Sequence, residues 1–166
     1  MRPGILYAAI FVWFVFTGGR FTAPFLKEVA HFDDGLIGSV FATQVIVGSF
    51  CGSFGAIFAD KMERLYPHYG RIGCLVACVV IGTIAFEAHF LVESMTDEES
   101  VQVFLHFMAR VLYSICTSIL DPTLDAITLT SLKEGNESES DYGRERLFGK
   151  GFFYYLRVVQ VLYLTT

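Results

Sequence analysis

Apolar residues occur in long blocks along this chain, separated by short polar connections. The clearest block is residues 36–59, which contains no charged residue and is long enough to cross about 30 Å of hydrocarbon as a helix. Four further blocks are apolar apart from a few charged residues: 5–26, 72–93, 101–132 and 150–166. The pattern predicts an all-α, polytopic membrane protein with about five transmembrane helices.

The composition agrees with this prediction and narrows the function. Hydrophobic residues make up 54% of the chain and charged residues 17%, whereas a soluble domain carries about 25% charged residues. The net charge of −5 is opposite to the basic surface that nucleic-acid binding needs, so no nucleic-acid partner is expected. The four cysteines lie in apolar blocks without metal-ligand spacing, and neither a metal nor a cofactor is expected.

Lysine and arginine residues gather in alternate connections between the blocks. The residues before the first block and the connections at 60–71 and 133–150 together hold eight of them, whereas the other two connections hold one, Lys27. Cytoplasmic loops of membrane proteins are enriched in these residues. The distribution therefore predicts a multi-pass integral membrane protein with a cytoplasmic N-terminus, and it does not identify the membrane.

The fourth block, residues 101–132, carries its polar residues on one helix face. At 100° per residue, six of them fall within about 80° of one another, and we call them the polar stripe: Arg110, Ser114, Thr117, Asp121, Asp125 and Thr128. Two interpretations remain open. Asp121 and Asp125 could pair with Arg110 or Arg157 in a structural network, or the stripe could line a path for a polar solute or a proton, which the placement of charges inside a membrane helix favours.

Pairs of aspartates also occur in two classes of membrane enzyme, which are therefore considered as alternative functions. Intramembrane aspartyl proteases need aspartates on two facing helices and a Gly-x-Gly-Asp motif, but both aspartates here lie on one helix and that motif does not occur. Phosphoalcohol transfer needs an upstream Asp-Gly-x-x-Ala-Arg, whereas Asp34-Gly35 continues as Leu-Ile-Gly. We therefore expect that the chain is not an enzyme.

The sequence DYGRERLFGKGFF at 141–153 contains Gly-Arg-x-Arg-Leu-Phe-Gly and follows the acidic residues of the fourth block. This arrangement resembles the oligosaccharide/proton symporter branch of the major facilitator superfamily, which includes lactose permease-like proteins. The resemblance implies that Asp125 and Arg146 bind the solute. It also implies secondary active transport, by symport of a small polar solute such as a sugar, with a coupling proton.

A second part of the resemblance lies in the connection between the second and third blocks. The sequence GAIFADK at 55–61, followed by Gly70-Arg71, is similar to a loop signature of this superfamily. The resemblance implies a cytoplasmic gate formed by Asp60, Lys61, Gly70 and Arg71. The chain departs from the signature at Ala56, which replaces a glycine, and in the inserted MERLYPHY.

The resemblance also sets the expected architecture. The five helices correspond to most of an N-terminal six-helix bundle, so the expected partners are the lipid bilayer and a missing C-terminal half. The alternative is a non-transporting receptor or accessory protein that keeps this fold. Two expectations concern packing: the Gly48-x-x-x-Gly52 stretch should let another helix approach closely, and Glu87 and His89 should reach the membrane interface.

Overall fold

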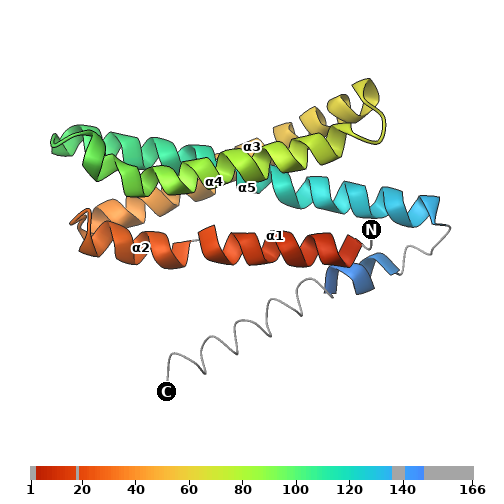
Figure 1. Cartoon of the computed structure of the whole chain (residues 1–166), viewed down its shortest axis with the longest axis horizontal. Coiled ribbons are helices and arrows are strands. Elements are labelled where there is room, and N and C mark those ends of the chain that lie inside the picture. Colours follow the sequence, from red (N-terminus) through yellow and green to blue (C-terminus); the bar gives the residue numbers. More distant parts are fainter. Residues whose placement is uncertain (1–2, 18, 136–140, 148–166) are drawn as a thin grey trace, which may run out of the picture. The chain divides into compact units, whose positions relative to one another are not determined.

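The computed structural model describes residues 3–17, 19–135 and 141–147. Five helices follow one another, and residues 141–147 are also helical (Figure 1): α1 (Pro3–Thr17), α2 (Gly19–Glu28), α3 (Asp34–Leu65), α4 (Gly70–Met95) and α5 (Glu99–Glu134). No strand occurs in these ranges. The predicted all-α fold is therefore confirmed. The fifth predicted helix, residues 150–166, lies outside the described residues.

Three of the described helices, α3, α4 and α5, are long and apolar enough to cross a membrane. The 32 residues of α3 and the 36 of α5 give lengths of about 48 and 54 Å at 1.5 Å per residue. Both helices are thus longer than the hydrocarbon thickness, and their charged ends extend beyond it. The first predicted segment, residues 5–26, corresponds to two helices, α1 and α2.

The chain forms two compact units. The first unit contains Met1–Gly18 and Leu124–Thr166, and the second contains Gly19–Thr123. The boundaries fall between α1 and α2 and within α5, immediately after Pro122 and Thr123. The first unit therefore holds α1, the end of α5 and the helix at 141–147, and the second holds α2, α3, α4 and most of α5.

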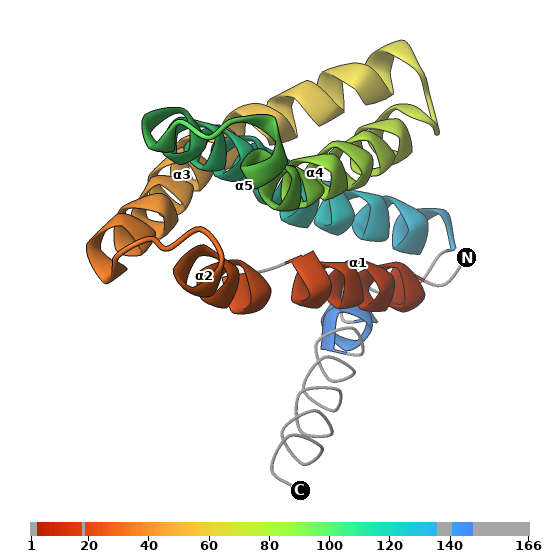
Figure 2. The ribbon, with the colours of Figure 1, turned by 60° about the vertical axis from the view of Figure 1, so that its left-hand side comes forward.

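The second unit is built from antiparallel neighbours. Short turns at 66–69 and 96–98 join α3 to α4 and α4 to α5, and α4 lies alongside both α3 and α5 (Figures 1 and 2). Asp33 caps the N-terminus of α3 by accepting the backbone N–H of Leu36 at 2.7 Å. That cap satisfies one of the free amide groups in the first turn of the helix.

Small residues on α3 allow it to approach α5 closely. A Cβ atom added to Gly48 would lie 3.4 Å from Ser114 Oγ, and one added to Gly52 would lie 3.4 Å from the backbone oxygen of Ser118. At Gly55 an added Cβ would overlap the side chain of Ile119. The expectation of close packing at Gly48 and Gly52 is therefore confirmed, and the contact continues to Gly55.

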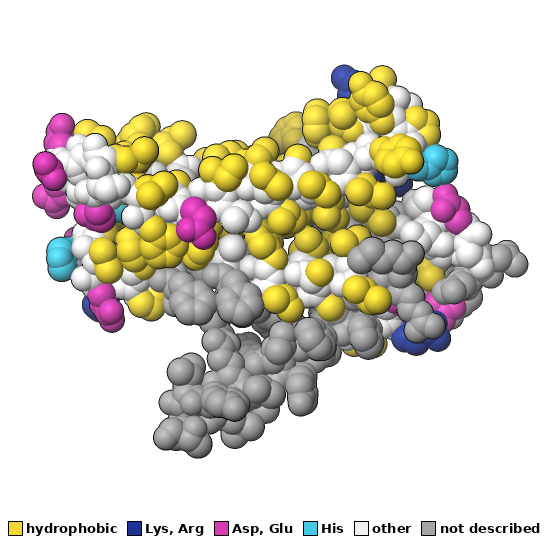
Figure 3. Space-filling model, viewed as in Figure 1, with side chains coloured by type: hydrophobic (Ala, Val, Ile, Leu, Met, Phe, Trp, Pro, Cys, Tyr) yellow, Lys and Arg dark blue, Asp and Glu magenta, His cyan; other side chains and the backbone are white. Residues whose placement is uncertain are grey.

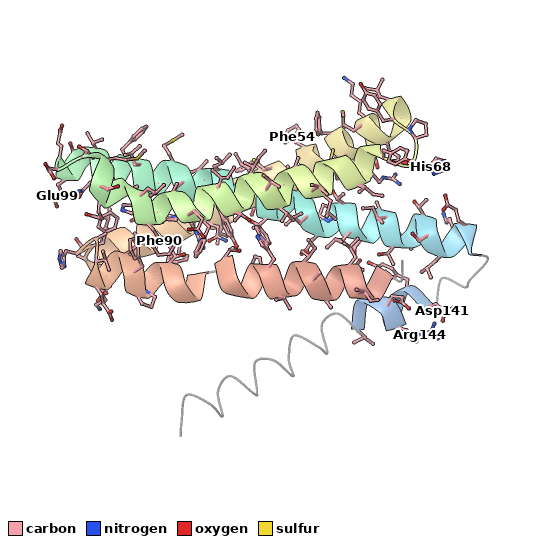
Figure 4. All side chains as sticks on the ribbon, in the orientation of Figure 1. Phe54, His68, Phe90, Glu99, Asp141 and Arg144 are labelled. Carbon is pink, nitrogen blue, oxygen red and sulfur yellow. The ribbon has the colours of Figure 1, made fainter. Side chains whose placement is uncertain are left out.

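The surface of α3 and α4 fits a lipid environment. Hydrophobic side chains cover most of their visible face, and charged side chains gather mainly near the helix ends (Figure 3). Phe54, which is 72% exposed, projects outward from α3, and His68 and Glu99 lie at opposite ends of the second unit (Figure 4). Large exposed apolar surfaces of this kind are typical of contact with lipid. The chain is an integral membrane protein.

Candidate solute-binding site

The first unit places three polar side chains around the carboxylate of Asp125, which lies on α5. Tyr7 on α1 donates its hydroxyl to Asp125 Oδ1. Arg146, from the helix at 141–147, lies with Nη2 3.7 Å from Asp125 Oδ2. Tyr142 also interacts with Asp125. The structure thus brings together the two residues predicted to bind solute, Asp125 and Arg146, and adds two tyrosines.

The helix at 141–147 determines which of its arginines reaches α5. Arg144 pairs with Asp141 on the same helix at 3.2 Å, and both are labelled in Figure 4. Arg146 instead faces Asp125, and its Nη1 donates to the hydroxyl of Tyr142 at 3.2 Å. Tyr142 and Arg146 are four residues apart and therefore share a helix face. The second arginine of the motif is the one that meets the carboxylate.

The electrostatics of this site are those of a partly exposed charge pair. The side chains of Arg146 and Asp125 are 39% and 28% exposed. Burial and the neighbouring Asp125 carboxylate raise the pKa of Tyr142, so this phenol stays neutral and keeps a proton to donate. An ionised carboxylate accepts hydrogen bonds and a guanidinium donates them in a planar fork. Together they can hold a ligand that both donates and accepts.

The rest of the polar stripe is not uniformly interior. Ser114 and Thr128 are each 1% exposed, and Thr117 is half-buried with its hydroxyl donating to the backbone oxygen of Ser114 at 3.1 Å. Asp121, in contrast, is exposed. The prediction of one continuous interior face is therefore wrong at Asp121.

Arg110 does not lie near the aspartates of its own helix. It lies 11 residues before Asp121 and 15 before Asp125, which is about 16 and 22 Å along α5, beyond the reach of an arginine side chain. Its guanidinium instead donates to Gln44 Oε1 and lies 4.6 Å from the ring centre of Phe41. The predicted pairing of Arg110 with Asp121 or Asp125 is wrong. Arg157 lies outside the described residues.

The turn between α3 and α4 brings two of the four predicted gate residues together. Arg71 donates from Nε and Nη2 to Asp60 Oδ1, at 3.1 and 2.8 Å. Gly70 is buried where an added Cβ would collide with the backbone of Met62 and Glu63. Lys61 is exposed.

The inserted segment MERLYPHY, residues 62–69, forms the end of α3 and the turn that follows it. The carboxylate of Glu63 accepts the backbone N–H groups of His68 and Arg71, at 2.7 and 2.9 Å. Both hydrogen bonds lower the pKa of Glu63, and the one from the Arg71 backbone has the larger effect. Sequence reasoning missed this residue, because its partners are backbone groups that only the folded turn brings close.

Sequence reasoning also missed Tyr7, Tyr142 and the burial of His89. The prediction that His89 reaches the interface is wrong, since it is 1% exposed and its Nδ1 lies 2.9 Å from Nδ1 of His106. Tyr142 could have been found from its spacing of four residues to Arg146. Tyr7 offered less signal, because a tyrosine in an apolar helix is also common at membrane interfaces.

Comparison with known proteins identifies the family. Neither the curated proteins nor the solved structures contain a match to this chain. The model of the MFS_1 like family matches residues 5–159, which is nearly the whole sequence and overlaps every helix described above. The chain therefore belongs to the MFS_1 like family, and through it to the major facilitator superfamily of membrane transporters.

Proposed function

We propose that this chain takes part in moving a small polar solute, such as a sugar, across a membrane, and that Asp125 and Arg146 bind the solute. The observation that carries the proposal is the ion pair between these residues, with Tyr7 and Tyr142 around it. A polyhydroxylated solute can donate to the carboxylate and accept from the guanidinium at the same time.

The geometry of the pair supports exchange with a solute. At 3.7 Å the closest Arg146 and Asp125 atoms are farther apart than in a tight charge-assisted hydrogen bond, and both side chains are partly exposed. A hydroxyl group can therefore enter between them without first breaking a buried ion pair. Secondary active symport with a proton, with the N-terminus in the cytoplasm, completes the proposal.

The proposal is tested by solute binding to the full chain in detergent or nanodiscs. Trp13, the sole tryptophan of the chain, lies on α1 with Tyr7, so its fluorescence can report binding of individual mono- and disaccharides. Asp125→Ala and Arg146→Ala should each raise the Kd at least about tenfold, because hydrogen bonds to charged groups contribute about 1.5–3 kcal/mol.

Matched controls come from the same helix. Arg144→Ala and Asp141→Ala remove an arginine and an aspartate that pair with each other, and both should leave sugar binding unchanged. If the Asp125 and Arg146 variants are as abundant as these controls and bind as tightly, the site assignment is wrong. Uptake of the bound sugar into proteoliposomes separates a transporter from a receptor, since a receptor binds the sugar without moving it.

A further inference from the structure

The second unit contains a group of four neighbouring polar side chains, three of them buried, that the solute site does not use. We call them the histidine cluster: His89 and Glu93 on α4, and His106 and Arg110 on α5. His89, His106 and Arg110 are 1%, 0% and 2% exposed. Each helix contributes two residues spaced four apart, so the cluster lies along one face of α4 and one face of α5.

The two histidines are in direct contact. Their Nδ1 atoms are 2.9 Å apart, and their rings stack with centres 5.2 Å apart. On the other side of His106, Nε2 lies 3.7 Å from Glu93 Oε1. Phe32 and Phe25 pack against the ring of His106, with ring centres 5.2 and 6.3 Å away. Within the pair, His106 therefore packs against two aromatic rings and lies near a carboxylate.

The cluster holds most of the unpaired polar atoms in the described part of the chain. Six buried side-chain atoms there have no hydrogen-bond partner, and five belong to the cluster: His89 Nε2, Glu93 Oε1, His106 Nε2, and Nε and Nη1 of Arg110. Burying a polar atom without a partner costs about 1–3 kcal/mol. So many unpaired atoms in one place indicate a ligand or a function rather than packing alone.

The contact between the histidines limits how many protons the pair can hold. One Nδ1 must donate and the other must accept, so the two rings cannot both be imidazolium ions in this contact. When His89 donates, His106 carries its proton on Nε2, facing the Glu93 carboxylate, and His89 Nε2 keeps a free lone pair. One proton from water can add to that lone pair, which gives a pair with a single positive charge and displaces no other proton.

The surrounding groups fit a site for one proton. Among the described residues, the charged groups that face the two rings are Glu93 from α4 and Arg110 from α5. Among the described side chains of α2 and the segment after it, Phe25 and Phe32 pack against the His106 ring, and α3 places the neutral Gln44 beside Arg110. Glu93 Oε1 is buried beside His106, whereas the Glu93 side chain as a whole is 33% exposed, so this residue extends from the histidine pair to the surface of the unit.

We propose that His89 and His106, with Glu93, form a binding site for a single proton inside the helix bundle. The proton is shared by the pair through the Nδ1–Nδ1 hydrogen bond, and the Glu93 carboxylate balances its charge. Chains of histidine and carboxylate groups carry protons in pumps and transporters. Use of this proton to drive a solute rests on the proposed transport, whereas proton binding itself does not.

The test is a pH titration of the full chain in nanodiscs, followed by ¹⁵N NMR of labelled histidines. The chain has four histidines, and the exposed His31 and His68 serve as internal references. His89 and His106 should change together at one midpoint, take up one proton between them and show a nitrogen–nitrogen coupling across their hydrogen bond. Glu93→Gln should move this shared midpoint to lower pH.

Two variants complete the design. His89→Gln should abolish the nitrogen–nitrogen coupling and shift the titration of His106, while the matched control His68→Gln should leave the buried pair unchanged. The proposal is overturned if His89 and His106 titrate at separate midpoints and take up two protons. It is equally overturned if neither ring titrates over the pH range in which circular dichroism shows intact helices, which would leave a structural hydrogen bond only. The unsubstituted chain alone decides between these outcomes if a variant fails to fold.

Discussion

Tyr7 differs from phenylalanine, which is frequent in α1, by one hydroxyl group. That hydroxyl donates a hydrogen bond to Asp125. Tyr7→Phe keeps the ring and its packing but removes one donor from the carboxylate. We expect sugar affinity to fall on the order of tenfold, because hydrogen bonds to charged groups contribute about 1.5–3 kcal/mol. Trp13 fluorescence measures the change, with Tyr66→Phe in the exposed turn as a control. An unchanged Kd in the Tyr7 variant would exclude the tyrosine from the site.

Glu63 determines how the turn between α3 and α4 responds to pH. The pKa of Glu63 is lower in the folded turn than in the unfolded chain, because two backbone N–H groups donate to its carboxylate. The stability that the Glu63 carboxylate gives to the folded turn is therefore fully present above its unfolded-state pKa. It is lost as the pH falls through the folded-state pKa. At neutral pH, Glu63→Gln should speed hydrogen exchange at the amides of His68 and Arg71.

The control for this experiment lies in the opposite turn. Glu98→Gln changes a carboxylate between α4 and α5 and should leave exchange at His68 and Arg71 unaltered. As the pH is lowered, the Glu63 carboxylate of the unsubstituted chain becomes protonated. The exchange rates of the His68 and Arg71 amides in that chain should then approach those of the Glu63→Gln variant at the same pH. Equal exchange in both proteins at neutral pH would show that the Glu63 carboxylate does not hold the turn.

At the residue scale, motifs in the sequence predicted the pair of Asp125 and Arg146 but not the tyrosine that contacts it from α1. Asp125 and Arg146 could be paired in advance because the Gly-Arg-x-Arg motif resembles one in a known family. Tyr7 could not, because its role depends on which face of α1 meets α5. The contact between His106 and His89 could not be predicted for the same reason. An isolated histidine in an apolar block does not indicate that a second histidine faces it from another helix.

At the scale of the elements, hydropathy located three helices within a few residues. The predicted segments 36–59, 72–93 and 101–132 correspond to α3, α4 and α5. Each helix continues beyond its apolar block, most clearly α3, which extends through residues 60–65, four of which are charged. Hydropathy measures where lipid can surround the chain, whereas backbone hydrogen bonding continues into water. It also cannot detect that α1 ends at Thr17 and α2 begins at Gly19.

The packing of α3 against α5 can be tested with two glycines of one helix. An added methyl group at Gly55 would overlap Ile119, whereas one at Gly38 would meet no atom within 4 Å. We expect Gly55→Ala to lower the free energy of unfolding by about 1–3 kcal/mol. Gly38→Ala should be neutral or stabilise by up to about 1 kcal/mol, because alanine favours helix more than glycine.

Thermal unfolding in detergent measures both glycine variants under one condition. Ile119→Ala combined with Gly55→Ala should recover part of the loss, since the colliding side-chain atoms are removed. Equal effects of alanine at Gly38 and Gly55 would mean that the two helices do not approach each other at Gly55.

At the scale of the whole molecule, the orientation of α5 follows from charges outside the membrane. The connection at 94–98 contains Asp97 and Glu98 but no lysine or arginine, whereas Lys133 and Arg144 follow the apolar part of the helix. Positive charges remain on the cytoplasmic side during insertion. We therefore expect the N-terminal end of α5 outside and its C-terminal end in the cytoplasm.

Two serines on α5 allow a direct test of this orientation. Ser100 and Ser131 are both exposed and lie about 46 Å apart along the helix, and cysteine replaces either without changing the charge distribution. In bacterial cells that produce the chain, with the four native cysteines replaced by alanine, an impermeant thiol reagent should label Ser100→Cys in intact cells. It should label Ser131→Cys only after permeabilisation. The reverse result would invert the topology, and labelling of both in intact cells would show that α5 does not cross the membrane.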